Sequence, residues 1–405
     1  TQNDYTEAIK VYDSLIVEYR NMNQYSKLAN TLNNKAYALS KMGDYDKNIS
    51  NAKEALEIQL KLDDWDKAGF SYSQIGQSYF SLGKFNDAVK AHQQSILYRT
   101  KGNNFEGMGY SYSKLGSLYI EIGDKVKAIA ALDSAKICYT KANLKDKLAE
   151  IDGSIGNIYL GDKNIAKAVV YFLKAYESLK LLGLKQEMAQ QLYNIADATY
   201  NDDIVQSRKY YQLAYDLYKQ IGIKDQMLYC LLNLGNLDTK EKKYNEAENK
   251  FNQALALSKE ISSKREQAIT YRKLADAAYT KLNLNEAITN YDKALGIFKE
   301  IDEKSEQASI LIAIAYANVS LGKFNDAETQ MQQSLAIATT TNNYGSKADA
   351  LASLSDLYQL KGQFAESKVM IDSCFKIYKQ LKNSYQLANT YILLGNYYNR
   401  LSDNI

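Results

Sequence analysis

Apolar and small residues recur at intervals of three and four positions along most of this chain, with polar residues between them. Residues 69–79 carry one such stripe, residues 88–98 carry a second, and Gly83 lies between the two. Intervals of three and four are typical of one face of an α-helix, whereas a half-buried strand repeats every two residues. A glycine between two stripes can take the left-handed conformation that closes a helix. The pattern therefore predicts two helices joined by a tight turn.

The helix pair repeats with a period of 40 residues along almost the whole length of 405 residues. One column of small residues marks this period, and we call it the anchor column: Ala36, Gly76, Gly116, Gly156, Ala196, Gly235, Ala275, Ala315, Ser355 and Gly395. Its spacing is 40 throughout, except for 39 between Ala196 and Gly235. A fixed period of this size predicts an array of stacked units, each packed on its neighbours.

The columns predict an all-α solenoid of nine full helix pairs with a half unit at each end. We call the first helix of each pair A and the second B. Residues 1–22 are expected to supply helix B only, residues 23–382 the nine pairs, and residues 383–405 a final helix A. The chain has no proline and no Gly/Ser-rich linker, so we expect one elongated domain. Apolar faces at both ends predict either a longer parent chain or self-association through the open ends.

Small residues also recur seven positions before the anchor and twice in helix B, which predicts close approach of neighbouring helices. Glycine occupies the turn after helix A in five units. Lys163, Lys242 and Leu282 replace it in three others, so those turns must close differently or at an energetic cost. The shortened fifth unit lacks the glycine as well, and we expect it to be the weak link of the array.

Motif residues recur in register with the anchor column. A large aliphatic residue precedes the anchor at Ile75, Leu115, Leu234 and Leu394, and a tyrosine follows three positions after it in several units. This pattern resembles the tetratricopeptide repeat (TPR) over almost the whole chain. Two features differ, because helix B has no proline and the period is 40 rather than about 34 residues. Both are similar to the extended TPR subclass of Pins-type scaffolds, kinesin light chains, Rap-type peptide sensors and the sensor regions of bacterial signalling proteins.

The resemblance implies a right-handed superhelix whose concave groove is lined by the A helices and binds a protein or peptide segment. Inward positions would flank the anchor column, and one polar residue per repeat could hydrogen-bond a peptide backbone. Aromatic residues on the same surface are typical of binding hot spots. The candidate peptide-binding residues are Phe70, Gln77, Tyr110, Ser113, Asn157, Tyr193, Asp197, Tyr229, Asn236, Arg272 and Asp276.

Two simpler interpretations of these positions stay open. The polar residues could be the solvated faces of amphipathic helices, and a chain with 35 tyrosines places some on every face. Asp197, Asp276 and Asp356 give the middle and later groove an acidic character that Arg272 offsets, which would suit a ligand with a basic stretch.

Composition excludes several classes of function. Lys and Arg number 50 against 47 Asp and Glu, with the signs interspersed, so no nucleic-acid-binding face is expected. No apolar run of 18 residues predicts membrane insertion, and no signal peptide is visible. Cys138, Cys230 and Cys374 have no C-x-x-C spacing and are expected to be reduced core residues. This favours a cytoplasmic location, with periplasmic and extracellular locations as alternatives.

No catalytic, metal or cofactor site is expected. The single histidine, His92, lies in a helix-B column of otherwise apolar residues and is interpreted as a buried packing residue. No nucleophile elbow, Walker A motif or H-E-x-x-H motif is present. We therefore expect a non-enzymatic scaffold that binds a protein or peptide. The alternative is a sensory or regulatory arm of a larger signalling protein that carries a kinase, protease or other effector.

Overall fold

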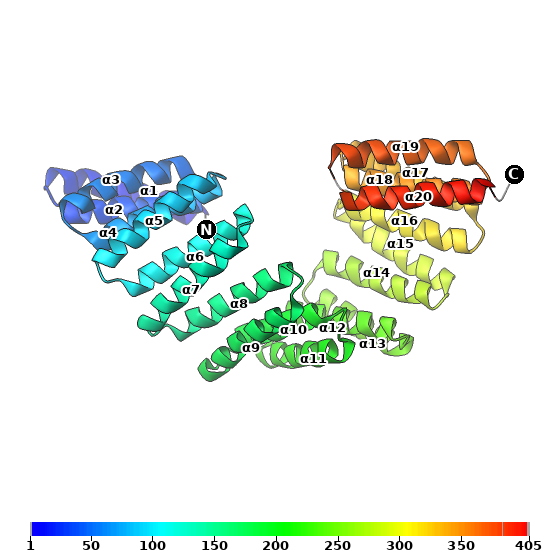
Figure 1. The fold of residues 1–405 in the computed structure, drawn as a ribbon, viewed down its shortest axis with the longest axis horizontal. Helices are drawn as coiled ribbons and strands as arrows, with labels where there is room; N and C mark the ends of the chain where they lie inside the picture. Colours follow the sequence, from blue (N-terminus) through cyan, green and yellow to red (C-terminus); the bar gives the residue numbers. More distant parts are fainter. Residues whose placement is uncertain (1, 383, 403–405) are drawn as a thin grey trace. The chain divides into compact units, whose positions relative to one another are not determined.

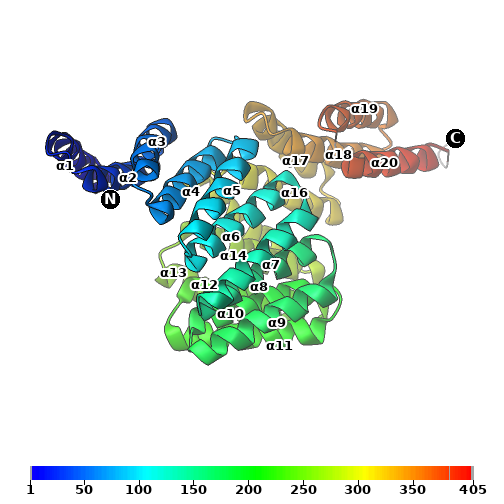
Figure 2. The ribbon, with the colours of Figure 1, turned by 60° about the vertical axis from the view of Figure 1, so that its left-hand side comes forward.

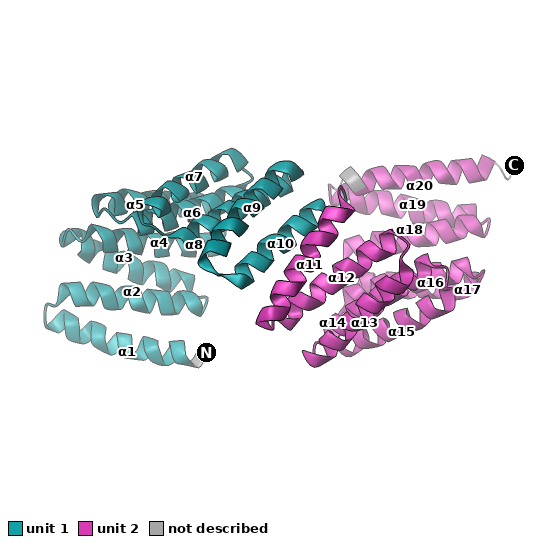
Figure 3. Cartoon of the chain, turned by 90° about the horizontal axis from the view of Figure 1, so that it is seen from below, with its two compact units in different colours: residues 1–201 teal, residues 202–405 magenta. Residues whose placement is uncertain are grey.

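The computed structural model describes residues 2–382 and 384–402, which form twenty α-helices and contain no strand (Figure 1). This confirms the prediction of an all-α solenoid. Residues 1, 383 and 403–405 of the predicted terminal half units lie outside the described part. The chain divides into two compact units, residues 1–201 and residues 202–405, and the division lies in the turn between α10 and α11 (Figure 3).

Unit 1 contains a B helix, α1, followed by four A/B pairs and a further A helix (Figure 2). Successive helices pack side by side, and the A helices α2, α4 and α6 also contact one another in turn. The bounds are α1 (Gln2–Asn21), α2 (Tyr25–Lys41), α3 (Tyr45–Lys61), α4 (Trp65–Ser81), α5 (Phe85–Lys101), α6 (Phe105–Ile122), α7 (Lys125–Lys141), α8 (Lys145–Gly161), α9 (Ile165–Leu182) and α10 (Lys185–Thr199).

Unit 2 begins with a B helix and continues the alternation to a final A helix, α20. Its A helices also contact one another, as α12 with α14 and α18 with α20. The bounds are α11 (Ile204–Ile221), α12 (Lys224–Lys240), α13 (Tyr244–Glu260), α14 (Lys264–Thr280), α15 (Leu284–Glu300), α16 (Lys304–Ser320), α17 (Phe324–Thr340), α18 (Tyr344–Leu360), α19 (Phe364–Gln380) and α20 (Ser384–Ser402).

The anchor column is small because a helix-B side chain packs directly on it. A Cβ atom added at Gly76 would lie 2.8 Å from His92, and one added at Gly235 would lie 2.5 Å from Phe251. Gly156 meets Phe172 in the same way. Such distances leave no space for a methyl group, so the predicted packing role of the anchor is confirmed.

Except for the turn of residues 200–203, the turns after helix A close in one way, whatever residue they contain. Gly83 has φ +71°, its N–H donates to the Phe80 carbonyl, and the next N–H donates to the Tyr79 carbonyl. This is the hydrogen-bond pattern of a Schellman motif. Leu282 has φ +65°, and its N–H and the next N–H make the two equivalent hydrogen bonds. Lys163 and Lys242 also have a left-handed backbone. The turns without glycine therefore close identically and carry the conformational cost.

The missing residue of the 39-residue spacing comes from the end of α10. Most helices contain 17 residues and are joined by three-residue turns, which gives the period of 40. Helix α10 contains only 15 residues, and residues 200–203 form a turn of four before α11 begins at Ile204. The low stability expected of this unit stays a prediction.

Candidate peptide-binding site

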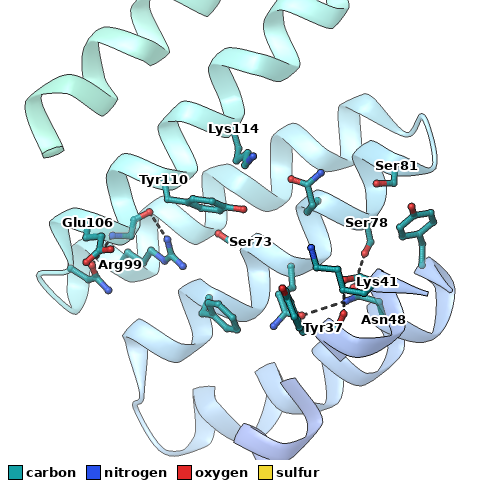
Figure 4. Close-up of a pocket in the computed structure, with 17 residues that line it drawn as sticks. Tyr37, Lys41, Asn48, Ser73, Ser78, Ser81, Arg99, Glu106, Tyr110 and Lys114 are labelled. Carbon is teal, nitrogen blue, oxygen red and sulfur yellow. Dashed lines mark hydrogen bonds between the residues drawn. The ribbon is translucent and has the colours of Figure 1, made fainter. Parts of the chain in front are cut away.

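Unit 1 contains a cavity of about 680 Å³ on the face formed by its first three A helices (Figure 4). Most of its lining comes from α2, α4 and α6, and Arg99 of α5 reaches it from a B helix. Its charged side chains are Lys41, Arg99, Lys114 and a single carboxylate, Glu106. We call it the basic cavity.

Three aromatic side chains stand in the wall of the basic cavity with much of their surface exposed. The exposed fractions are 49% for Tyr37, 44% for Phe70 and 40% for Tyr110. Covering an exposed aromatic ring removes a large apolar surface from water, and fixing the ring loses little side-chain entropy. Exposed aromatic side chains therefore contribute strongly to binding. The cavity therefore offers apolar contact area beside its cations.

The cations lie against the aromatic rings. Lys41 Nζ is 5.1 Å from the centre of the Tyr37 ring, and Lys114 Nζ is 5.3 Å from that of Tyr110. Arg99 Cζ is 5.9 Å from the same Tyr110 ring. These are cation–π distances, so the rings hold the positive groups at the rim of the cavity. Burial raises the pKa of Tyr110, and attraction to Arg99 and Lys41 offsets part of that rise.

Polar side chains also form the floor of the cavity. The Asn48 amide donates to the Ala36 carbonyl at 2.7 Å, and the Ser78 hydroxyl donates to Asn48 Oδ1 at 2.7 Å. Ser73 lies in a buried cluster with the hydroxyls of Ser95 and Ser111, at 2.9 Å and 3.1 Å. Because these groups satisfy one another, the floor is rigid and presents a polar surface to a ligand.

The structure brings together three of the predicted site residues, because Phe70, Gln77 and Tyr110 all line the basic cavity. The other predicted residues of unit 1 lie outside it. Ser113 and Tyr193 are half-buried, whereas Asn157 and Asp197 are exposed. These residues lie at the predicted positions of their own repeats, but they do not line the basic cavity.

The four predicted residues of unit 2 are half-buried, and three make contacts with other side chains. The Tyr229 hydroxyl donates to Glu266 at 3.0 Å, and Arg272 pairs with Glu306 at 3.1 Å. Asp276 accepts a 2.7 Å hydrogen bond from the Tyr291 hydroxyl. Asn236 is half-buried in α12. These contacts hold neighbouring helices together, which is a structural role for residues predicted to face a ligand.

Sequence reasoning missed Lys41, Arg99 and Lys114. A signal for Arg99 exists, because it is the single cation in a helix-B column that otherwise holds Gln59, Tyr139, Leu179, Tyr218, Ser258, Phe298, Ala338 and Tyr378. A cation at one core position of a repeat needs a reason that its equivalents do not share.

Unit 2 contains a smaller cavity of about 320 Å³ between α18, α19 and α20, and we call it the acidic cavity. Asp349 and Asp356 line it, and burial raises the pKa of both carboxyl groups. The Tyr378 hydroxyl donates to Asp349 at 3.2 Å. This cavity carries the acidic character that Asp356 predicted for the later array.

His92 is 1% exposed, as predicted, and burial lowers its pKa to about 3. Its Nδ1 has no hydrogen-bond partner within the described chain. Cys138, Cys230 and Cys374 are buried free thiols. Residues 2–382 and 384–402 contain no cluster of three His, Cys, Asp or Glu side chains that could hold a metal ion. No helix within these ranges has the length and hydropathy needed to cross a membrane.

Two segments of the chain, residues 27–96 and 266–340, match the tetratricopeptide-repeat family. Both segments are tetratricopeptide repeats (TPRs). A small glutamine-rich tetratricopeptide repeat-containing protein 2 of Mycosarcoma maydis is 33% identical to the chain over 93 residues. That match covers 23% of this chain and 23% of the relative, so the two share only a short segment.

Solved structures resemble the chain over most of its length. RapI in its apo form covers 88% of this chain and is itself 99% covered, with a TM-score of 0.61 and 15% identity. A STAND signal-transduction ATPase with a TPR sensor, from Pyrococcus horikoshii, has a TM-score of 0.56 and 16% identity, covering 87% of this chain and 54% of that one. The apo quorum sensor NprR of B. thuringiensis has a TM-score of 0.52 and 18% identity, covering 85% and 94%. At these identities the likeness concerns the fold alone.

Proposed function

We propose that the protein is a scaffold without catalytic activity that binds a peptide segment of a partner protein, and that the basic cavity anchors this segment. The observation that carries the proposal is the cavity itself. It has about 680 Å³ of space, walled by the exposed rings of Tyr37, Phe70 and Tyr110 on adjacent A helices. Cavities of this size with aromatic walls and a few polar groups are typical ligand sites.

The repeat geometry favours a peptide over a compact ligand. One A-helix column supplies Tyr37 and Gln77, and another supplies Phe70 and Tyr110, so equivalent groups recur at each repeat. An extended peptide has the same kind of regularity, since side chains and backbone amides alternate along it. Asn157 and Asn236 continue the first column, and we propose that longer ligands use them as well.

Selection from a random dodecapeptide display library tests this function. We expect the wild-type protein to enrich peptides that lose affinity by roughly tenfold or more in a Phe70→Ala/Tyr110→Ala variant, because two aromatic anchors disappear. Fluorescence anisotropy with the enriched peptides measures the change in affinity. Circular dichroism establishes that both proteins are equally helical.

Val126→Ala/Ile137→Ala is the matched control, because both residues are exposed apolar side chains on the B helix α7. The control should bind the enriched peptides as tightly as the wild type. Peptides that bind the cavity variant and the wild type equally, or that lose affinity only in the control, would show that the A-helix face is not the site.

A sensory role within a larger signalling protein is the second candidate. It is favoured by the fold likeness to a STAND ATPase with a TPR sensor and to the quorum sensor NprR. In this case the peptide would act as a signal, and the complete protein would carry an activity that changes when a cavity-binding peptide is added. An effector activity that the peptide leaves unchanged would argue for the scaffold.

A further inference from the structure

The repeat places the B helices α5, α7 and α9 in succession on one side of unit 1. Helices α5 and α7 flank a groove of about 380 Å³ whose floor is formed by Leu115 and Tyr119 of α6. Helices α7 and α9 both pack on α8. The A helices therefore lie beneath these three helices. We call the outward surface of α5, α7 and α9 the B-helix face.

Aliphatic side chains protrude from the B-helix face. On α7 these are Val126 and Ile137, and on α9 they are Val170 and Leu181. The members of each pair are eleven residues apart, which is three helical turns, so each pair lies on one line along its helix. Val126 and Leu181 are 81% and 86% exposed. Leu97 of α5 occupies the position of Ile137 one repeat earlier and is exposed as well.

The B-helix face is also strongly basic. Helices α5, α7 and α9 contain nine lysines and three acidic residues, and their one arginine, Arg99, is buried. Three successive B helices of unit 2, α13, α15 and α17, contain four lysines and eight acidic residues. Their large apolar side chains are buried or half-buried, except for Phe324 at the start of α17. Positive charge and exposed aliphatic surface thus occur together on unit 1 and are not a general property of the repeat.

More than half of these lysines have no carboxylate partner. The five that form no ion pair with a described residue are Lys90, Lys101, Lys141, Lys167 and Lys174. Four of the five lie on aromatic rings, as Lys167 Nζ does at 5.0 Å from the centre of the Tyr159 ring and Lys174 Nζ at 4.6 Å from that of Tyr171. A ring holds an ammonium group in place and leaves its charge uncompensated. These cations can therefore meet an anion without breaking an existing ion pair.

The residue types of the B-helix face favour a lipid surface over a protein or a nucleic acid. Protein interfaces are enriched in arginine and aromatic side chains and depleted in lysine. Single-stranded nucleic acids stack their bases on exposed aromatic rings, whereas the exposed large apolar side chains of this face are all aliphatic. Lysines interspersed with protruding aliphatic side chains match an anionic bilayer, in which charged headgroups cover an apolar layer.

We propose that the B-helix face binds peripherally to a lipid bilayer that contains anionic phospholipids. The unpaired lysines attract the negative headgroups, and Val126, Ile137, Val170 and Leu181 enter the interface between them. This inference goes beyond the proposed function and does not depend on it, because the basic cavity lies mainly on the A helices. A protein bound in this way would hold its peptide partner at a membrane surface.

Co-sedimentation of the protein with extruded vesicles tests the proposal. One set of vesicles contains phosphatidylcholine alone, and in the other set part of it is replaced by phosphatidylserine. We expect binding to the phosphatidylserine vesicles to be at least about tenfold tighter and to weaken as the salt concentration rises. Equal binding to both sets, or binding to neither, would overturn the proposal.

A pair of lysine variants tests the location of the site. We expect Lys167→Gln/Lys174→Gln on α9 to weaken binding to the phosphatidylserine vesicles by roughly tenfold. Lys293→Gln/Lys299→Gln is the matched control, because it removes two exposed lysines from α15 and lowers the net charge equally. The control should bind as the wild type does. Equal losses in both variants would show that net charge alone controls binding, which would overturn the assignment to the B-helix face.

The variant Val126→Ser/Leu181→Ser tests whether the occupant is a bilayer. Both side chains are highly exposed, so the fold should tolerate the change, and circular dichroism checks this for every variant. We expect binding to the phosphatidylserine vesicles to weaken by several-fold, because fewer apolar groups enter the interface. Binding that is lost in the α9 lysine variant but unchanged here would indicate a purely electrostatic site for an acidic macromolecule and would overturn the bilayer as its occupant.

Discussion

The basic cavity of unit 1 and the acidic cavity of unit 2 occupy equivalent places in the repeat but carry opposite charge. Arg99 and Tyr378 stand at the same helix-B position, and Phe70 and Asp349 stand at the same position of the A helix that precedes it. In unit 1 the result is a cation without an ion-pair partner, whereas in unit 2 the Tyr378 hydroxyl donates to the Asp349 carboxylate. The backbone thus determines where a cavity forms, and one or two side chains per repeat determine what it can bind.

One packing pair in the interior of unit 1 also differs from an equivalent pair in unit 2. Gly76 packs on His92 in unit 1, where Gly235 packs on Phe251 in unit 2. Both helix-B side chains are buried, but the imidazole has an unsatisfied nitrogen and the phenyl ring has none. Unit 1 therefore combines a cavity that could hold a ligand with a titratable core residue, His92. Protonation of His92 at low pH should destabilise unit 1.

The largest effect is expected from His92→Phe, which copies the unit 2 arrangement into unit 1. The pKa of His92 is lowered to about 3 from an ordinary value of 6.5, so the unfolded chain binds the proton first as the pH falls. Native stability is therefore lost between these values, and the phenyl ring removes the loss. We expect the gain in unfolding free energy to be roughly 2 kcal/mol larger at pH 5 than at pH 7.5.

Urea denaturation at both pH values measures this gain. Met331→Leu, at the same buried helix-B position in unit 2, carries no titrating group and should give the same change at both pH values. A gain from His92→Phe that does not depend on pH would mean that His92 does not distinguish the two interiors.

Leu282→Gly tests the turns, which contain glycine around the basic cavity but not throughout unit 2. Leu282 is 80% exposed and has φ +65°, so its side chain contributes strain and little packing. We expect the glycine variant to be more stable by about 1 kcal/mol, because only glycine adopts this conformation without a steric cost. Thermal and urea unfolding measure the gain. Leu181→Gly, at a similarly exposed leucine in the last turn of α9, should instead lose stability, and a loss in both variants would refute the strain argument.

The smallest effect is expected from Asp356→Asn in the acidic cavity, and its sign opposes that of His92. Burial raises the pKa of Asp356, so the native state holds the proton to higher pH than the unfolded chain does. The ionised carboxylate costs stability above that pKa, and the cost disappears as the pH falls. Asn should therefore stabilise unit 2 at pH 7 and change little at pH 3, as thermal melting at the two values would show. Stabilisation that is larger at pH 3 would contradict the buried-carboxylate interpretation.

The fold could be predicted from the sequence because the anchor column repeats ten times and marks one packing unit per repeat. The binding site could be predicted only in part. Phe70, Gln77 and Tyr110 belong to columns that are exposed or half-buried in every repeat, so periodicity located them. Arg99 belongs to a buried column in which the other repeats have no cation. The sequence alone does not explain this one cation, and the structure does so by placing Gly69 and Gly107 against its side chain. The sequence also placed Lys163 in a turn, but it did not predict that the backbone of this residue is left-handed.

The dependence of Arg99 on two glycines also constrains how such a site can arise by mutation. An arginine entering α5 while residue 69 or 107 still carried a side chain would crowd that side chain, so this order of mutations passes through a destabilised intermediate. The reverse order, with both glycines first, weakens two helices slightly and leaves them folded. The buried arginine is therefore reached at a lower cost in stability when both glycines come first.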